Sequence, residues 1–219
     1  MEGRFIKEMR IRLGLTQGQL AELMLVDQGT VSRWERGAEV PRPASQSRLR
    51  DILLRDDARR ALQRSLAVVR HNLLPSSLLD RKLRLIEISA SGQRHFRQRG
   101  RDPDSLIGMD LERFADRIGF PLLNRELRHS GFLSGDALLF RFVSNFDGRG
   151  HSTVYEPIFE GGALVGVLNY VSAYFDLPRN GGFSVETIEA IQSDDPLKSV
   201  VLYSGAHAAE AQSALRQAG

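Results

Sequence analysis

The segment from Thr16 to Gly37 constrains the fold of this 219-residue chain more strongly than any other. Thr16 precedes Gln19 by three residues, which is the spacing of a capping box at the start of a helix. Asp27 is a second candidate N-cap, and Gly37, followed by Pro41, is a typical helix end. The segment therefore predicts two short helices joined by a tight turn.

Apolar residues at helical spacing predict further helices on both sides of this segment. Residues 3–13 and 45–54 each carry apolar side chains three or four positions apart, so each range is expected to form an amphipathic helix. With the two short helices they make residues 1–55 an all-α domain of four to five helices. Residues 56–74 are expected to form a connecting helix that begins at a pair of aspartates. Its apolar stripe suits either a short dimer seam or packing against the next domain.

The second short helix has an inner and an outer face. Val31 and Trp34 lie three residues apart and are expected to point into the core. The other side chains suit contacts in a DNA groove, because Gln bonds adenine, Arg bonds guanine and the Thr methyl group contacts thymine. Gln17, at the start of the first short helix, is placed to meet a phosphate. The residues expected on the outer face are Gln28, Gly29, Thr30, Ser32, Arg33 and Arg36.

Residues 5–54 resemble the helix-turn-helix domain of the lambda-repressor/Cro-like (XRE) family. The resemblance rests on short motifs, namely Leu15-Thr16-Gln17, Leu20-Ala21, Val31-Ser32, Trp34-Glu35-Arg36-Gly37 and, at the right distance, Pro41. It implies a double-stranded DNA partner, with bases read by Gln28, Gly29, Thr30 and Arg33 and phosphates bound by Gln17 and Arg36. One position departs from the family: Leu25 stands in the turn where Gly is usual, and Leu disfavours a positive φ.

Basic residues are concentrated near these helices. Residues 1–70 hold 14 Lys and Arg against 9 Asp and Glu, whereas residues 71–219 hold 16 against 18. A basic excess beside a DNA-binding surface would neutralise phosphates, although a plain solvated surface has a similar composition. The chain has no cysteine, which excludes disulfides, thiolate metal sites and cysteine nucleophiles.

The pattern changes from helical to mixed after Pro75. Residues 83–89 alternate and predict a strand, residues 91–130 predict three helical pieces, and three alternating segments follow between 137 and 175. A hairpin, short helices and a three-stranded meander indicate an antiparallel sheet with helices on one face. This order resembles a PAS domain. Two short motifs add to the resemblance, namely Leu79-Asp80-Arg81 before a strand and Ser105-Leu106-Ile107-Gly108 before a short helix. The chain is then α+β, with a sensor or regulatory domain at 75–178 that is PAS-like or, as the alternative, GAF-like.

In the PAS family the sheet and helices enclose a small pocket that holds haem, flavin, a metabolite or nothing. The lack of cysteine excludes a flavin photoreceptor of the cysteine-adduct type. His95 and His129 are the candidates for a haem ligand, although a lone His in a helix is more often a surface or core residue. The cofactor is therefore unknown. Aromatic residues that could line a cavity, or simply fill the core, are Phe96, Phe114, Phe140, Phe142, Tyr155 and Tyr170.

Residues 179–219 are expected to form a mostly helical tail. Within it, 185–191 is predicted as a short helix and 197–217 as an Ala-rich one. Its acidic residues suit a solvated face better than an acid/base pair; they are Glu186, Glu189, Asp194 and Asp195. No phosphate-binding loop, metal-ligand spacing or nucleophile motif occurs in the chain, so enzyme activity and a metal site are not expected.

The sequence thus predicts a cytoplasmic, DNA-binding transcription regulator with no membrane-spanning segment. A homodimer on a palindromic operator is expected, with a PAS-like domain that senses a small-molecule effector or binds a protein. A protein of another class fits the same residues, namely an interaction or antitoxin-like module whose C-terminal domain grips a protein partner. Gel shifts on random-sequence DNA distinguish the two classes.

Overall fold

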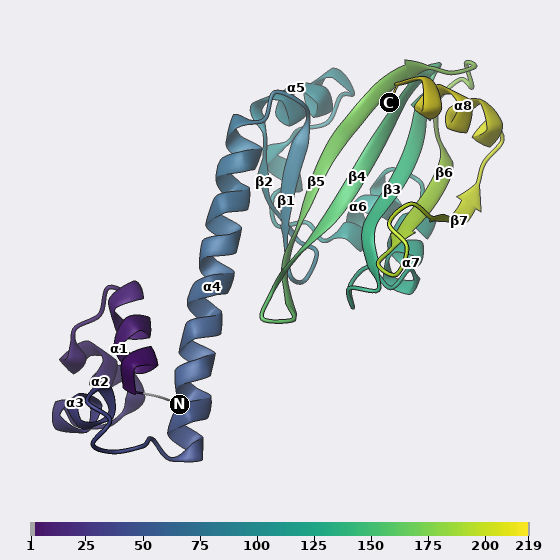
Figure 1. Ribbon diagram of the computed structural model, residues 1–219. Helices are drawn as coiled ribbons and strands as arrows, with labels where there is room; N and C mark the ends of the chain where they lie inside the picture. Colours follow the sequence, from purple (N-terminus) through teal and green to yellow (C-terminus); the bar gives the residue numbers. More distant parts are fainter. Residues whose placement is uncertain (1–2, 219) are drawn as a thin grey trace. The chain divides into compact units, whose positions relative to one another are not determined.

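The computed structural model describes residues 3–218 (Figure 1). The chain divides into two compact units, Met1–Arg60 and Ala61–Gly219. Each unit has an apolar core of its own. The first unit is all-α and the second is built around a sheet, so the α+β class predicted from the sequence is confirmed.

Three short helices and the beginning of a long one make up the N-terminal unit. They are α1 (Gly3–Arg12), α2 (Gln17–Met24), α3 (Gln28–Glu35) and α4 (Pro43–His71). The predicted capping box starts α2: the N–H of Gln19 donates to Oγ1 of Thr16 at 3.1 Å, and the N–H of Thr16 donates to Oε1 of Gln19 at 2.8 Å. Asp27 caps α3 by accepting from the N–H of Thr30 at 3.0 Å.

The core of this unit lies where its four helices meet. Helices of eight or ten residues, such as α1 to α3, are unstable alone in water, because helix nucleation is costly. Here each helix contributes apolar side chains to one cluster, and their burial stabilises all of them together. The principal buried side chains are Ile6, Leu20, Val31, Trp34 and Leu49.

The turn between α2 and α3 contains a strained residue. Leu25 has φ 56° and ψ 45°, the left-handed region that glycine prefers. In this conformation its N–H donates to the carbonyl groups of Ala21 and Glu22 and so ends α2. The chain therefore keeps the tight turn although Leu replaces the usual Gly.

Replacement of Leu25 by glycine is expected to raise the free energy of unfolding of the N-terminal unit by up to about 1 kcal/mol. The left-handed conformation costs roughly 1 to 2 kcal/mol for a non-glycine residue, and the greater freedom of glycine in the unfolded chain offsets part of the gain. Little burial is lost, since Leu25 is 77% exposed. Urea denaturation followed by the fluorescence of Trp34, the single tryptophan, measures the change. Leu23→Gly, inside α2, is the control and should destabilise; a similar loss in both variants would contradict a strained turn.

The helix after α3 is longer than predicted. The two helices expected over 45–54 and 56–74 are one continuous helix, α4. The helix continues through Asp56 because no Gly or Pro interrupts the segment, and the carboxylate of Asp56 pairs along α4 with Arg59 at 3.0 Å and Arg60 at 2.6 Å. Neither α4 nor any other helix within residues 3–218 is long and apolar enough to cross a membrane.

An antiparallel sheet of seven strands forms the centre of the C-terminal unit in the described part of the chain. Its strands are β1 (Ser76–Asp80), β2 (Leu85–Ile88), β3 (Ala137–Phe146), β4 (Arg149–Glu160), β5 (Ala163–Asp176), β6 (Phe183–Gln192) and β7 (Ser199–Ser204). Their order across the sheet is β2-β1-β5-β4-β3-β6-β7. The predicted hairpin is β1 with β2, the predicted meander is β3 to β5, and pairing of β1 with β5 joins the two.

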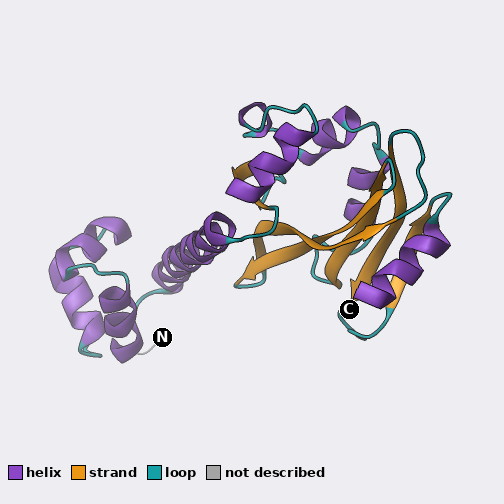
Figure 2. Cartoon of the chain, turned by 90° about the horizontal axis from the view of Figure 1, so that it is seen from above, coloured by secondary structure: helices purple, strands orange, loops and turns teal. Residues whose placement is uncertain are grey.

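The helices predicted between hairpin and meander cover one face of the sheet (Figure 2). They are α5 (Ala90–Gln98), the short 3-10 helix η1 (Asp104–Leu106), α6 (Leu111–Arg117) and α7 (Leu122–His129). Leu111 and Leu123 from these helices pack with Phe140 of β3 in the main core. A further helix, α8 (Ala208–Ala218), packs through Ala211 onto Val143 of β3. Since side chains alternate along a strand, Val143 and Phe140 face opposite sides, and α8 covers part of the second face.

The mostly helical tail predicted for residues 179–219 is wrong in its first part. The segment 185–191 is not a helix but the centre of β6, and the residues before α8 include the strand β7. β6 pairs with β3 along its whole length. The hydrogen bonds and burial that this pairing provides outweigh the local helix preference of the segment.

Two of the four acidic residues that were predicted to be solvated, Glu186 and Glu189, are buried, whereas Asp194 and Asp195 are exposed as predicted. The side chain of Glu186 is hydrogen-bonded to the hydroxyl of Ser184 and accepts from the N–H of His207 at 2.8 Å. Glu189 pairs with Arg141 of the neighbouring strand. The bond from the N–H of His207 anchors the start of α8, because it places the carboxylate of Glu186 where a helix presents free N–H groups.

Candidate functional site

The outer face of α3 presents the side chains that the sequence assigned to it. Val31 and Trp34, on the inner face, are buried as predicted. The others are at least partly accessible, the exposed ones being Gln28, Gly29, Arg33 and Arg36 and the half-buried ones Thr30 and Ser32. The fold therefore brings these six residues together on one accessible surface.

Arg33 is held in place by its neighbours on this surface. Its Nη2 donates to Oγ1 of Thr30 at 2.8 Å, and its Nε donates to Oε2 of Glu39 at 2.9 Å. The hydroxyl of Thr30 donates in turn to Asp27, and this bond, with the N–H of Thr30 and the charge of Arg33, lowers the pKa of Asp27. A Cβ at Gly29 would lie 3.0 Å from Oδ1 of Asp27, a tight contact, and 3.5 Å from Nη1 of Arg33, an ordinary one. Arg33 is thus oriented, with Nη1 unused by any residue of the described chain.

Gln17 is tied to the interior through Glu35. Its Nε2 donates to Oε2 of Glu35 at 2.9 Å, while Arg10 donates to the same carboxylate from Nε at 2.5 Å and Nη2 at 3.2 Å. Burial by itself would raise the pKa of Glu35, but the hydrogen bonds from Arg10 and Gln17 hold it below its ordinary value. The network joins α1, α2 and α3. A phosphate contact at Gln17 would therefore use the backbone N–H, which the first turn of a helix leaves unpaired.

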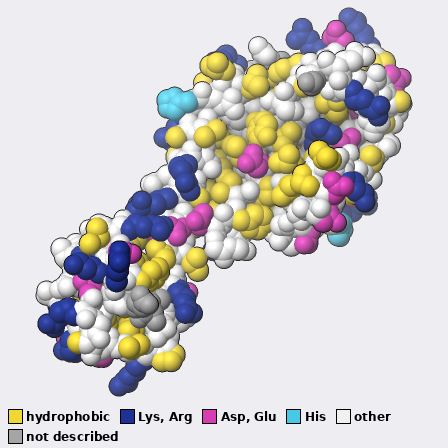
Figure 3. All heavy atoms as spheres, in the orientation of Figure 1, with side chains coloured by type: hydrophobic (Ala, Val, Ile, Leu, Met, Phe, Trp, Pro, Cys, Tyr) yellow, Lys and Arg dark blue, Asp and Glu magenta, His cyan; other side chains and the backbone are white. Residues whose placement is uncertain are grey.

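Lys and Arg side chains are abundant on the N-terminal unit. Figure 3 shows them in dark blue over the visible face of this unit, with fewer Asp and Glu side chains between them. They belong to the basic excess of residues 1–70, which hold 14 Lys and Arg against 9 Asp and Glu. Such a surface attracts polyanions independently of their sequence.

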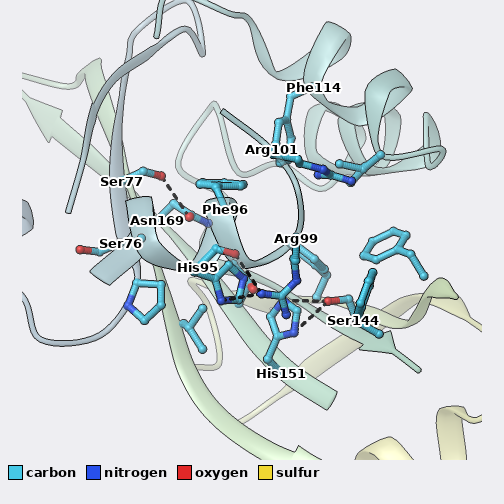
Figure 4. Close-up of a pocket in the computed structure, with 18 of the residues that line it drawn as sticks. Ser76, Ser77, His95, Phe96, Arg99, Arg101, Phe114, Ser144, His151 and Asn169 are labelled. Atoms are coloured by element: carbon cyan, nitrogen blue, oxygen red, sulfur yellow. Dashed lines mark hydrogen bonds between the residues drawn. The ribbon is translucent and has the colours of Figure 1, made fainter. Parts of the chain in front are cut away.

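A cavity of about 130 Å³ lies in the C-terminal unit, between the sheet and the helices α5 and α6 (Figure 4). Aromatic rings form much of its wall, and four of the residues named for this purpose from the sequence line it, namely Phe96, Phe114, Phe142 and Tyr155. Two others do not: Phe140 belongs to the core beneath, and Tyr170 is not part of the wall. Phe146 and Phe183 complete the aromatic lining.

Two histidines and an arginine meet on one side of the cavity (Figure 4). Nη1 of Arg99 donates to Nδ1 of His95 at 2.8 Å, which leaves the proton of a neutral His95 on Nε2. The ring of His151 meets that of His95 edge to face, with 5.5 Å between centroids, and Oγ of Ser144 lies 2.9 Å from its Nε2. The guanidinium of Arg99 also lies 5.3 Å from the centre of the Phe146 ring.

Both histidines are neutral near pH 7. Burial, with the charges of Arg99 and Arg101, lowers the pKa of His95 from 6.5 to about 4. Burial, with the charge of Arg99 and the ring of His95, lowers the pKa of His151 from 6.5 to about 3. The two arginines stay charged, because an Arg pKa starts far above neutrality. Among the described residues that line the cavity, Arg99 and Arg101 are therefore the charged ones.

The cavity does not fit a haem or a flavin. A cavity of about 150 Å³ accommodates one benzene ring, so 130 Å³ is a volume for a single small ring. His95 lines the cavity, but its Nδ1 accepts a hydrogen bond from Arg99 and its Nε2 then carries the proton. Neither ring nitrogen is therefore free to bind iron. His129, the other candidate haem ligand, is exposed at the end of α7. The geometry suits a small molecule instead.

The sequence alone did not identify Arg99, Arg101 and His151 as site residues. The available signal was charge, since residues 97–101 read Arg-Gln-Arg-Gly-Arg with no acidic residue among them. No local signal marks His151, because its place follows from the pairing of β4 with β3 opposite Ser144. The cavity residues come from elements far apart in the chain, and only the folded sheet brings them together.

Acidification is expected to destabilise the C-terminal unit. The unfolded chain binds protons at both histidines near pH 6.5, whereas the folded chain binds them only near pH 4 and pH 3, so stability falls as pH drops below about 6.5 and levels off near the folded values. Circular dichroism of urea unfolding at about pH 7.5 and about pH 5 measures the loss. His151→Asn should reduce this pH dependence, while His71→Asn, on the exposed end of α4, should not. An equal slope in all three proteins would contradict the assignment.

Residues 3–63 match the family model of the helix-turn-helix domain. The match covers α1 to α3 and the first part of α4, and this part of the chain is a helix-turn-helix domain. No curated protein sequence matches the chain.

The C-terminal part of the chain is similar to solved PAS and LOV structures. The PAS domain of BvgS from Bordetella pertussis has 17% identity over 54% of this chain and 88% of that one, with a TM-score of 0.40. A LOV protein from Rhodobacter sphaeroides has 17% identity over 56% and 70%, with a TM-score of 0.41. The phage VqmA–DPO complex has 13% identity over 56% and 55%, with a TM-score of 0.36. The order of hairpin, helices and meander in this unit is itself PAS-like, as the sequence predicted.

Proposed function

We propose that this protein is a sequence-specific, DNA-binding transcription regulator of the cytoplasm and not an enzyme. The observation that carries the proposal is the accessible face of α3 in the helix-turn-helix domain. Glutamine, threonine and arginine side chains lie on this accessible face, while the opposite face of α3 is buried in the core. These side chains hydrogen-bond or contact base edges in the major groove.

The residues divide into two groups in this proposal. Base edges are contacted from the accessible face of α3, by Gln28, Gly29, Thr30 and Arg33. Gln17 at the start of α2 and Arg36 at the end of α3 contact phosphates on either side, with Ser32 next to the groove. Phosphate contacts set the position of the protein on DNA, and base contacts determine the sequence.

The protein is proposed to bind as a homodimer. α3 has eight residues and is about 12 Å long, so that one copy reads only a few base pairs. Two copies place their third helices in successive major grooves about 34 Å apart and so recognise a palindromic operator. The C-terminal unit is proposed to sense a small-molecule effector, which its cavity of about 130 Å³ supports.

Selection from a pool of random-sequence duplexes tests this function. At about 150 mM salt, with unlabelled competitor DNA, the full-length protein is expected to enrich a palindrome with half-sites about 10 base pairs apart. Native mass spectrometry of the complex should show two chains. Equal retention of all duplexes would overturn the sequence-specific role. A single chain on an enriched site would overturn the dimer alone.

A further inference from the structure

The cavity of the C-terminal unit carries positive charge that no nearby acidic residue balances. Arg99 and Arg101 line it, and neither forms an ion pair with any Asp or Glu within residues 3–218. Other arginines of the same unit, such as Arg113 and Arg125, each have a carboxylate partner. The charges that act on Arg99 from its surroundings include two more cations, Arg101 and Arg149.

Both guanidinium groups also have unused donors. The hydrogen bonds of Arg99 come from Nη1 alone, to Nδ1 of His95 at 2.8 Å and to the carbonyl oxygen of His95 at 3.4 Å. A guanidinium has five N–H donors, so Nε and Nη2 of Arg99 have no partner in the described chain. Arg101 makes no side-chain hydrogen bond to that same part of the chain. Burial lowers the pKa of both groups, as expected for cations without a counter-ion.

The rest of the wall determines the shape of an occupant. Phe96 and Phe114 lie edge to face, 6.2 Å between ring centres, and Phe142 faces the same cavity. The hydroxyl groups of Thr153 and Tyr155, also on the wall, are not hydrogen-bonded to any described residue. Burial raises the pKa of Tyr155, so its hydroxyl keeps its proton and can act as a donor. The cavity therefore combines an apolar slot with cationic and neutral donors.

We infer that this cavity binds a small organic carboxylate. The carboxylate lies beside Arg99 and Arg101, and an apolar part no larger than a single ring lies among the phenylalanines. Guanidinium groups suit this role because their parallel N–H bonds match the two oxygens of a carboxylate. The volume of about 130 Å³ sets the size limit. The inference rests on the proposed sensing role of the C-terminal unit and specifies the chemical class of its effector.

Isothermal titration of the full-length protein with benzoate tests the inference, with benzamide as the neutral molecule of the same shape. Benzoate is expected to bind saturably at millimolar concentration or below, and benzamide about tenfold more weakly or worse. Arg99→Gln and Arg101→Gln should each weaken benzoate binding about tenfold or more, with little effect on benzamide. Arg99→Lys keeps the positive charge but lacks the parallel N–H donors of a guanidinium. It should therefore bind benzoate more tightly than Arg99→Gln but less tightly than the unaltered protein. Arg113→Gln is the matched control and should change nothing, since Arg113 is exposed outside the cavity.

Four results would overturn the inference. Three of them are the absence of saturable benzoate binding in the millimolar range, equal binding of benzamide, and unchanged benzoate affinity in both glutamine variants. Displacement of benzoate by inorganic phosphate at equal concentration would show a plain anion site and would also overturn it. Circular dichroism checks that the variants fold. If Arg99→Gln does not fold, Arg101→Gln is used for the binding test.

Gel shifts on the selected operator, with and without benzoate, separate this inference from the proposed function. Arginine-dependent benzoate binding with unchanged operator affinity would support the cavity assignment and refute the sensing role. Sequence-specific DNA binding without benzoate binding would support the regulator and refute the effector class. A change in operator affinity that Arg99→Gln abolishes would support both.

Discussion

Replacement of Glu35 by alanine is expected to lower the free energy of unfolding of the N-terminal unit by about 2 to 3 kcal/mol. The side chain of Glu35 is 4% exposed and accepts hydrogen bonds from Arg10 and Gln17. Its removal leaves the guanidinium of Arg10, whose side chain is 14% exposed, without a counter-ion, and a largely desolvated charge without a partner is costly. Urea denaturation followed by the fluorescence of Trp34 reports this unit specifically, because Trp34 lies in its core.

Two variants distinguish the loss of the buried pair from the loss of any carboxylate. Glu39→Ala removes a similar side chain, but Glu39 pairs with Arg33 at the surface, so the change should stay within about 0.5 kcal/mol. Replacing both partners, Arg10→Met with Glu35→Leu, should recover much of the stability, because neither charge is then left buried alone. A loss at Glu35 no larger than at Glu39 would show that the network contributes little.

The helices of the N-terminal unit could be predicted because their signals are local. The capping box of Thr16 and Gln19 and the N-cap at Asp27 act within one turn of chain, and all of these bonds form in the structure. The inner positions Val31 and Trp34 follow from helical spacing alone. The one irregular element, the turn at Leu25, was visible as a departure, but its left-handed backbone follows from the packing of α2 against α3.

Strand β6 could not be predicted because the contacts that create it are distant in the chain. Glu186 and Glu189 suggest a solvated helix when they are considered as neighbours. In the fold, Glu186 bonds the N–H of His207, 21 residues away, and Glu189 bonds Arg141, 48 residues away. Pairing with β3 then determines the conformation of the segment, and local propensity does not.

The existence of the candidate cavity could be predicted from the sequence, but the charged and polar side chains that line it could not. A PAS-like order of elements implies a pocket between helices and sheet, and Phe96 and Tyr155 could be named as wall residues from their type. The meeting of His95 with His151 required α5 to lie over β4. The unbalanced charge of Arg99 could be recognised only when no acidic neighbour was found for it in the described chain. The sequence pattern therefore predicts where a pocket lies, while tertiary contacts decide which side chains line it.

Replacement of Arg33 by alanine is expected to cost about 1 to 3 kcal/mol of binding free energy at one base pair of the operator, a roughly 5- to 150-fold loss of discrimination. Thr30 and Glu39 orient the guanidinium of Arg33 in the free protein, so in the proposed complex it would lose little conformational freedom on meeting a base. Fluorescence anisotropy on the selected operator and on its three substitutions at the contacted position measures the change.

Arg33→Ala also leaves the carboxylate of Glu39 without its partner beside DNA phosphates, which would weaken binding to every sequence. The double variant Arg33→Ala with Glu39→Ala separates the two effects: general affinity should recover, whereas discrimination at the one base pair should remain lost. Arg36→Ala is the complementary control, expected to weaken all sequences alike and to reduce the salt slope by about one. If Arg33→Ala lowers affinity equally for all four base pairs, Arg33 contacts the backbone, and the base-reading role passes to Gln28 and Thr30.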